Sequence, residues 1–192
     1  PAPTFDAPQP TAQADPAKPQ QKPAMELIGK LAPAFTASTI DGKALTDADF
    51  SKHPATILNF FAANCPHCKK QIPVVETVRK EYEAKGVRFV NVSQTMRQPL
   101  PNEQIVDLVK GLGSGLELVT DPDNKIGPLF KAGSFPTMVI VGKDGKVATV
   151  NVGNSPDLET RLKGQLDALI AGKPIEAAPP AARPAVDAAK IV

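Results

Sequence analysis

Cys65 and Cys68 are the only cysteines in the chain, and they lie three positions apart in the stretch FFAANCPHCKKQIP, residues 60–73. A disulfide between them closes a loop too small to restrict the unfolded chain much, so it contributes little stability. An isolated C-x-x-C motif near a β-α-β pattern is typical of redox chemistry. Zinc sites use the same spacing. We therefore expect a redox pair, with a metal site as the alternative.

The two cysteines fall where a strand pattern changes into a helix pattern. Residues 55–61, ATILNFF, form a short apolar run suited to a buried strand, and residues 66–85 have the spacing of an amphipathic helix. Residues 87–93, VRFVNVS, have the composition of a second strand. These segments predict a β-α-β unit with a right-handed crossover, and they place Cys65 at the N-terminus of its helix.

The remaining pattern predicts an α/β domain over residues 25–173. A hairpin over 35–45 is expected around Asp41-Gly42, because Asp-Gly suits a tight turn. The later elements are a helix at 102–112, a strand at 116–121, a short helix at 124–130, a hairpin at 135–153 and an amphipathic helix at 156–172. We expect a central mixed β-sheet flanked by helices, with the first hairpin as an N-terminal extension. Met96 and Met138 are expected to be packing residues.

Residues 1–24 and 174–192 are rich in proline and alanine and poor in large apolar side chains, so we expect two disordered segments, a linker and a tail. The formal net charge is only +2 and both signs are spread along the chain, which argues against a nucleic-acid partner. No apolar run approaches the roughly 18 residues of a membrane span. We expect a protein with one folded domain.

Four segments resemble the thioredoxin superfamily, and more closely its TlpA/ResA-like branch of extracytoplasmic thiol-disulfide oxidoreductases. They are IGKLAPAFTASTIDGKAL (28–45), NFFAANCPHCKKQIP (59–73), SFPT (134–137) with KDGK (143–146), and VGNSPDLETRL (152–162). The resemblance implies a thioredoxin-like fold. It makes Cys65 the exposed nucleophile and Cys68 the buried resolving thiol. It also implies that Pro136 is a cis proline facing the two cysteines, and that the backbone around Phe135 pairs with an extended substrate segment.

Three positions depart from the family pattern. Asn64 stands before the first cysteine, where the family usually has Trp, so its substrate contacts at that edge are expected to differ. Asn59 stands where thioredoxins keep a buried Asp, and Gln71 stands where several of the reductases carry Glu. Neither position holds a carboxylate, so the sequence offers no obvious proton acceptor for Cys68.

The dipeptide inside the motif, Pro66-His67, is the pair found in DsbA-like oxidases. Disulfide exchange needs a thiolate, and unpaired N–H groups at a helix N-terminus stabilise one on Cys65. Pro66 suits the first helical turn, and His67 adds a donor or a positive charge, so both residues are expected to tune the redox potential. The family favours reduction and the CPHC motif favours oxidation or isomerisation, which leaves both directions open.

Two other functions are weighed against disulfide exchange. In a SCO-like copper-binding module, Cys65, Cys68 and His67 would hold Cu(I), but that family uses a wider cysteine spacing and a distant downstream histidine, and no histidine follows His67. A thiol peroxidase needs a P-x-x-x-T-x-x-C arrangement, and residues 58–65 carry neither the Pro nor the Thr.

The expected partners and location follow from the leading hypothesis. We expect protein substrates with disulfides or thiols, a separate redox partner, and no metal or other cofactor. Residues 1–24 resemble the spacer that holds such domains away from a membrane anchor, which would lie outside this sequence. A periplasmic or similarly extracytoplasmic location, with a membrane tether, is therefore expected.

Overall fold

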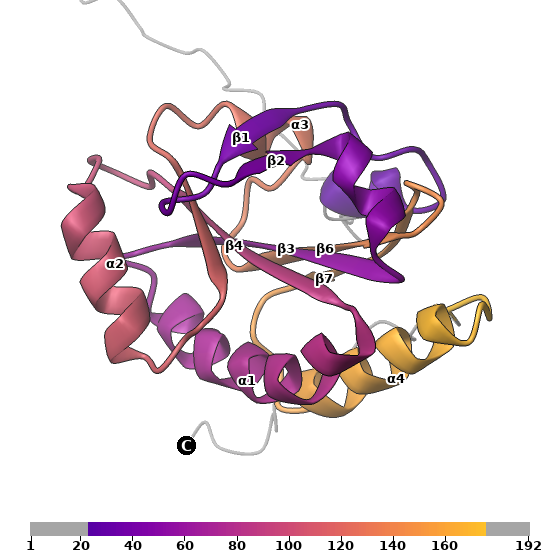
Figure 1. The fold of residues 1–192 in the computed structure, drawn as a ribbon. Helices are drawn as coiled ribbons and strands as arrows, with labels where there is room; N and C mark the ends of the chain where they lie inside the picture. The colour runs from indigo at the N-terminus through magenta and orange to yellow at the C-terminus, as the bar shows by residue number, and fades with distance from the viewer. Residues whose placement is uncertain (1–22, 176–192) are drawn as a thin grey trace, which may run out of the picture.

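The computed structural model describes residues 23–175, which form a five-stranded mixed sheet with helices on both faces (Figure 1). The strand order is β5-β4-β3-β6-β7. The strands are β3 (Ala55–Ala62), β4 (Arg88–Gln94), β5 (Glu117–Asp121), β6 (Thr137–Gly142) and β7 (Val147–Val152). β3 pairs in parallel with β4, and β4 with β5, while β6 runs antiparallel to both β3 and β7.

The other elements surround this sheet. The helices are α1 (Pro66–Tyr82), α2 (Asn102–Gly111), α3 (Ile126–Leu129) and α4 (Leu158–Ile170). Three 3-10 helices are η1 (Pro23–Leu27), η2 (Asp47–Lys52) and η3 (Glu83–Lys85), and the hairpin strands are β1 (Thr36–Ser38) and β2 (Ala44–Thr46). None of the helices within residues 23–175 combines the length and the apolar character that crossing a membrane requires.

β3 is the central strand of the sheet, and all eight of its residues are buried. Its side chains alternate between two apolar cores, as the pleat of a strand requires. Ile57 faces the core under α1 and α4, whereas Leu58 and Phe60 face the core under the hairpin and α3. A strand buried on both faces explains the nearly continuous apolar run in the sequence.

The first core is closed by α1 and α4, which lie side by side across one face of the sheet in Figure 1. Tyr82, the last residue of α1, donates a hydrogen bond of 2.8 Å to Asp167 of α4. Burial, together with this bond, raises the pKa of Tyr82 to about 12. The second core is aromatic, since Phe130 packs against both Phe35 and Phe60 with ring centroids 5.5 and 5.4 Å apart.

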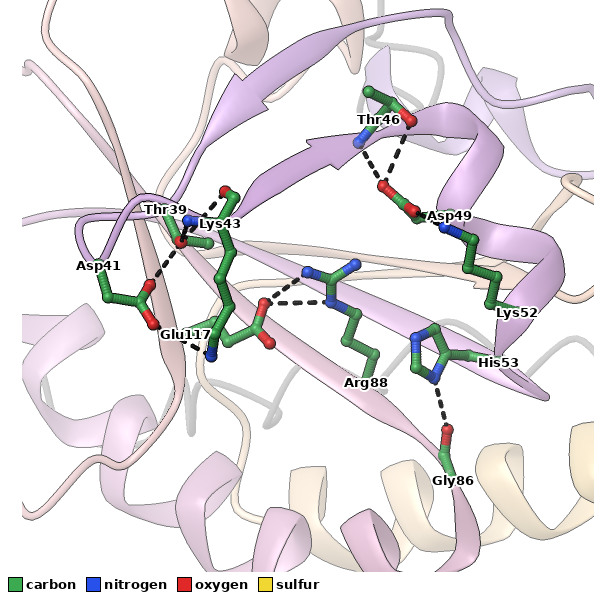
Figure 2. Close-up of polar contacts among 10 residues, drawn as sticks. All are labelled: Thr39, Asp41, Lys43, Thr46, Asp49, Lys52, His53, Gly86, Arg88 and Glu117. Atoms are coloured by element: carbon green, nitrogen blue, oxygen red, sulfur yellow. Dashed lines mark hydrogen bonds and ion pairs between the residues drawn. The ribbon is translucent and has the colours of Figure 1, made fainter.

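The N-terminal hairpin is attached to the edge of the sheet through backbone and side-chain contacts. Ile40 N donates to Leu118 O of β5 at 2.7 Å. Figure 2 shows Thr39, Asp41 and Lys43 hydrogen-bonded around the hairpin turn. The capping box of η2, in which Thr46 and Asp49 bond reciprocally, follows β2 directly and fixes the return of the chain toward β3.

The structure confirms the expected order of elements, both hairpins and the β-α-β unit of residues 55–93. The expected short helix at 124–130 shrinks to Ile126–Leu129, because Asn124 adopts a left-handed backbone with φ of 52°. Met138 is fully buried as expected, but Met96 is 44% exposed, so its assignment to the core was wrong. Met96 lies in the loop between β4 and α2.

The expected disordered segments fall almost entirely outside the described residues. Of residues 1–24, the structure describes Pro23 and Ala24, which belong to η1, and Ala24 is 2% exposed. The folded domain therefore includes both residues, slightly ahead of the expected boundary at 25, because Ala24 packs into the aromatic core. Of the expected tail, only 174 and 175 are described.

Gly127 provides a test of how tightly α3 is held to the sheet. A Cβ at this position would lie 1.7 Å from Nε2 of Gln94, whose amide donates to buried Asp121 at 2.9 Å. We expect Gly127→Ala to lower the free energy of unfolding by about 1–3 kcal/mol, because overpacking must displace Gln94. Urea titration measures this.

Gly164→Ala is the matched control for that substitution. No atom lies within 4 Å of a Cβ at Gly164, and the residue stands inside α4. Alanine there should raise the free energy of unfolding by roughly 0.5–1 kcal/mol, because it lowers the backbone entropy of the unfolded chain. Equal effects of the two substitutions would contradict the close packing at Gly127.

Candidate active site

Cys65 is the N-cap residue of α1, three residues beyond the end of β3. Its backbone is extended, with φ of −89° and ψ of 113°, and Pro66 follows at the first helical position. The Cys65 Sγ accepts a hydrogen bond from the backbone N of Cys68 at 3.3 Å. The sulfur thus occupies the place of a capping oxygen, where the helix offers unpaired N–H groups and the positive end of its dipole.

Cys68 lies one turn into α1 and is fully buried. Cys65 is only 5% exposed, so the expectation of an exposed Cys65 was wrong for this structure, in which the loop of Phe135 lies against its sulfur. Both thiols are free in this structure. Burial raises the pKa of Cys68 to about 12, and its hydrogen bond with Cys65 contributes in the same direction. Cys68 is therefore a neutral thiol at neutral pH.

The loop before β6 provides the wall facing Cys65. The Cys65 Sγ donates to the Phe135 carbonyl at 3.8 Å, and the Phe135–Pro136 peptide bond is cis, as expected. Thr137 Oγ1 donates to Ser134 O at 2.6 Å, and Gly153 N donates to Pro136 O at 2.8 Å. These bonds fix the loop from both sides, so the Phe135 carbonyl keeps its position beside the sulfur.

The structure brings four of the seven residues expected at the site into one buried or half-buried group. Cys65, Cys68 and Phe135 share an apolar cluster, and Pro136 is buried next to Phe135. The other three, Asn64, Pro66 and His67, are exposed and border Cys65 along the chain. The predicted residues therefore form a protected dithiol with a polar, solvent-facing rim.

A narrow cavity beside Asn64 was not anticipated from the sequence. It has a volume of about 10 Å³. Polar and apolar residues line it together, namely Asn64, Ser93, Gln94, Thr95, Gln98 and Thr120 with Ala63, Leu100, Ile105 and Pro122. Thr95 is held there by Asn124, which exchanges two hydrogen bonds of 2.8 and 2.9 Å with its backbone. The position follows the general rule that crevices in open α/β sheets lie beyond the carboxyl ends of parallel strands.

Within residues 23–175, no three His, Cys, Asp or Glu side chains are grouped so that they could hold a metal ion. His53, the other histidine of the chain, lies just before β3, at the end of this strand remote from Cys65. Its Nδ1 is 3.0 Å from the Gly86 carbonyl oxygen, as Figure 2 shows. His53 therefore has a local structural contact and stands apart from the dithiol.

The chain is similar in sequence to a known family and to named thiol-disulfide oxidoreductases. The AhpC/TSA family profile matches residues 28–150. The thiol-disulfide oxidoreductase ResA of Bacillus cereus is 27% identical over 139 residues, which cover 72% of this chain and 76% of that protein. ResA of Bacillus subtilis is 27% identical over 127 residues, which cover 65% of this chain and 67% of that protein.

Solved structures show the same thioredoxin-like fold, which confirms the fold expected from the sequence. The thioredoxin domain of a thiol-disulfide oxidoreductase from Bacteroides vulgatus superposes with a TM-score of 0.60 at 22% identity, covering 71% of this chain and 95% of that one. A secreted disulfide oxidoreductase from Mycobacterium tuberculosis superposes with a TM-score of 0.55 at 22% identity, covering 70% and 95%.

The difference between the two thiols predicts selective alkylation. With Cys65→Ser, only Cys68 remains, and we expect iodoacetamide to leave it largely unmodified at pH 8, because a thiol with a pKa of about 12 holds little thiolate there. With Cys68→Ser, the remaining Cys65 should be modified readily. Mass spectrometry over a pH series measures both rates, and equal rates at pH 8 would contradict the assignment.

Proposed function

The chain belongs to the AhpC/TSA family. From its similarity to the thiol-disulfide oxidoreductases ResA, we propose that it exchanges disulfides with protein substrates through Cys65 and Cys68. The observation that carries this proposal is the position of the Cys65 sulfur at the start of α1, 3.3 Å from the Cys68 N–H group. This N–H group stabilises a thiolate, and a thiolate is the form that attacks a disulfide.

The reaction proceeds in two exchange steps. In the reducing direction, the Cys65 thiolate attacks one sulfur of a substrate disulfide, and the other substrate sulfur leaves as a thiolate and takes up a proton. Cys68 then loses its proton and attacks the Cys65 sulfur of the mixed disulfide, and the second substrate sulfur leaves. The substrate gains two thiols and the enzyme gains the Cys65–Cys68 disulfide; the oxidising direction is the reverse.

The loop of Phe135 and Pro136 is proposed to bind the substrate segment that carries the reacting sulfur. The Phe135 carbonyl oxygen lies 3.8 Å from Cys65 Sγ and is a hydrogen-bond acceptor. An extended substrate peptide has backbone N–H groups that can donate to it. Asn64, which is exposed and directly precedes Cys65, is proposed to contact the same segment.

The proposed location is periplasmic or otherwise extracytoplasmic, with a membrane tether outside this sequence. Protein disulfides persist in oxidising compartments, so an enzyme that exchanges them meets its substrates there. One of the structural neighbours is a secreted disulfide oxidoreductase, which agrees with this proposal. A separate redox partner must restore the dithiol or the disulfide after each cycle.

Substitution of each cysteine tests the proposed order of attack. Cys68→Ser should accumulate a mixed disulfide between Cys65 and a model substrate, because no thiol is present to resolve it. Cys65→Ser should lower turnover to the background rate, because Cys68 is buried. Intact-mass spectrometry after acid quenching detects the adduct. Turnover by the Cys65→Ser variant would exclude Cys65 as the nucleophile.

The reduction potential tests the role of His67 and the direction of exchange. We expect a value between about −270 mV, that of thioredoxin, and about −120 mV, that of DsbA. His67→Ala should make the potential more negative by roughly 10–20 mV, because the Cys65 thiolate loses a nearby donor or positive charge, an exposed interaction worth about 0.5–1 kcal/mol.

Equilibration in glutathione buffers with a count of free thiols measures the potential. His53→Ala is the control, since His53 lies at the other end of β3, and it should leave the potential unchanged. A wild-type value near the thioredoxin end supports a reductase, and a value near the DsbA end supports a disulfide donor. An unchanged potential in His67→Ala would exclude the tuning role.

A further inference from the structure

Three buried side-chain atoms near Cys68 have no hydrogen-bond partner within residues 23–175. They are both polar atoms of Gln71, Oε1 and Nε2, and the Oδ1 of Asn59. Both side chains are fully buried. Leaving a buried polar group unpaired costs about 1–3 kcal/mol, so native proteins rarely keep one without a compensating role. Thr56 Oγ1 and Arg161 Nε are also buried and unpaired, so the lack of a partner alone assigns no role. What relates Gln71 to the reaction is its place on the same helix as Cys68.

Both amides lie in the layer between β3 and α1. Gln71 follows Cys68 by three residues in α1, so the two side chains are neighbours on one helix face. Asn59 alternates with Ile57 and Phe61 on one face of β3. Ile57 packs with side chains from the middle of α1, and Phe61 packs in the cluster that contains Cys68. Asn59 is thus placed between two contacts to α1.

Only one of the unpaired atoms can stabilise a thiolate. The Asn59 Nδ2 already donates to Asn91 Oδ1 at 2.9 Å, and its unpaired Oδ1 is an acceptor. The Gln71 Oε1 is also an acceptor. A thiolate accepts hydrogen bonds, so it requires a donor. Gln71 Nε2 is therefore the one unused side-chain donor among these three atoms.

Cys68 needs such a donor during one step of the reaction. In the resting state it is a neutral, fully buried thiol. When it attacks the mixed disulfide its sulfur must carry negative charge, and burial penalises that charge. A donor left unpaired in the resting state and paired only as the charge forms lowers the barrier more than it stabilises the starting state.

We propose that the side-chain amide of Gln71 donates a hydrogen bond to the Cys68 sulfur while that sulfur attacks the mixed disulfide. This inference rests on the proposed function. In the step, the Cys68 S–H proton passes to the leaving substrate sulfur, directly or through solvent. The Cys65–substrate bond breaks, the Cys65–Cys68 bond forms, and the substrate thiol is released. No other oxidant or reductant takes part.

A neutral amide gives this donor a property that a charged group lacks. It places no permanent charge in the apolar layer, so it neither repels the thiolate nor requires a buried counter-ion. The unpaired amide of Gln71 instead destabilises the resting state, because it is buried there without a hydrogen-bond partner. The substitution Gln71→Met, which keeps the length of the side chain without its polar atoms, should therefore leave the protein at least as stable while slowing the reaction.

The experiment separates the two exchange steps in the full chain. The reduced protein is mixed with a fluorescent peptide disulfide, and rapid quenching with mass spectrometry follows formation of the mixed disulfide and release of the peptide thiol. Gln71→Met should form the mixed disulfide at the wild-type rate and resolve it about 10- to 100-fold more slowly, the effect of losing a hydrogen bond to a charged group. Its melting temperature should equal or exceed that of the wild type.

Thr56→Val is the matched control. Thr56 Oγ1 is also buried and unpaired, but Thr56 lies at the start of β3, the end remote from the cysteines. Removing this hydroxyl should leave both rates unchanged and the melting temperature no lower. Gln71→Leu is a second apolar replacement, measured in the same way if the Met variant does not fold.

The outcomes distinguish this inference from the proposed function. If the wild type forms and resolves the mixed disulfide and Gln71→Met resolves it equally fast, the inference is overturned and the proposed function stands. If Gln71→Met slows both steps equally, or lowers the melting temperature of the protein, Gln71 has a structural role. Either result also overturns the inference. If the wild type forms no mixed disulfide, the proposed function itself fails.

Discussion

The site depends on one junction, the point where β3 ends and α1 begins. β3 is buried on both faces in the middle of the sheet, so its carboxyl end is fixed by β4 on one side and by β6 on the other. Cys65 follows as the N-cap of α1, and its sulfur replaces the oxygen that usually caps a helix. The cis-peptide loop at Phe135 leads into β6, the antiparallel neighbour of β3. The same sheet therefore positions both the nucleophilic sulfur and the carbonyl that faces it.

Two chemically identical residues acquire different properties from positions three residues apart. Cys65 stands outside the first turn, where N–H groups face its sulfur, and Cys68 stands within the helix against the apolar core. Burial raises the pKa of Cys68 to about 12. In the proposed reaction, the first thiol meets the substrate, and the buried second thiol attacks the mixed disulfide that the first has formed. The proposed order of reaction rests on these two positions in the helix.

Buried amides elsewhere in the fold show how unusual the layer beneath the dithiol is. Asn151 of β7 and Gln165 of α4 are buried and bond reciprocally at 2.8 and 3.4 Å. Buried Asp121 likewise accepts from Gln94 and from the backbone at the start of α3. These groups are satisfied and stabilise contacts between elements. Gln71 has the same chemistry and burial as Gln165 but no partner in the described chain, which is why a role in the reaction explains it better than a role in stability.

The sequence by itself determined the order of the elements and placed the two cysteines at the junction of a strand and a helix. Apolar periodicity, the Asp-Gly turns and the position of C-x-x-C between a strand and a helix are local signals, and they act over distances that neighbouring residues span. The sequence did not determine which side chains that are distant along the chain come into contact. Phe135 reaches Cys65 from 70 residues away, known beforehand only by family resemblance, and the narrow cavity beside Asn64 was not foreseen. The burial of Gln71 without a partner and the exposure of Met96 were also decided by tertiary packing, because each depends on which surfaces the sheet and helices bring face to face.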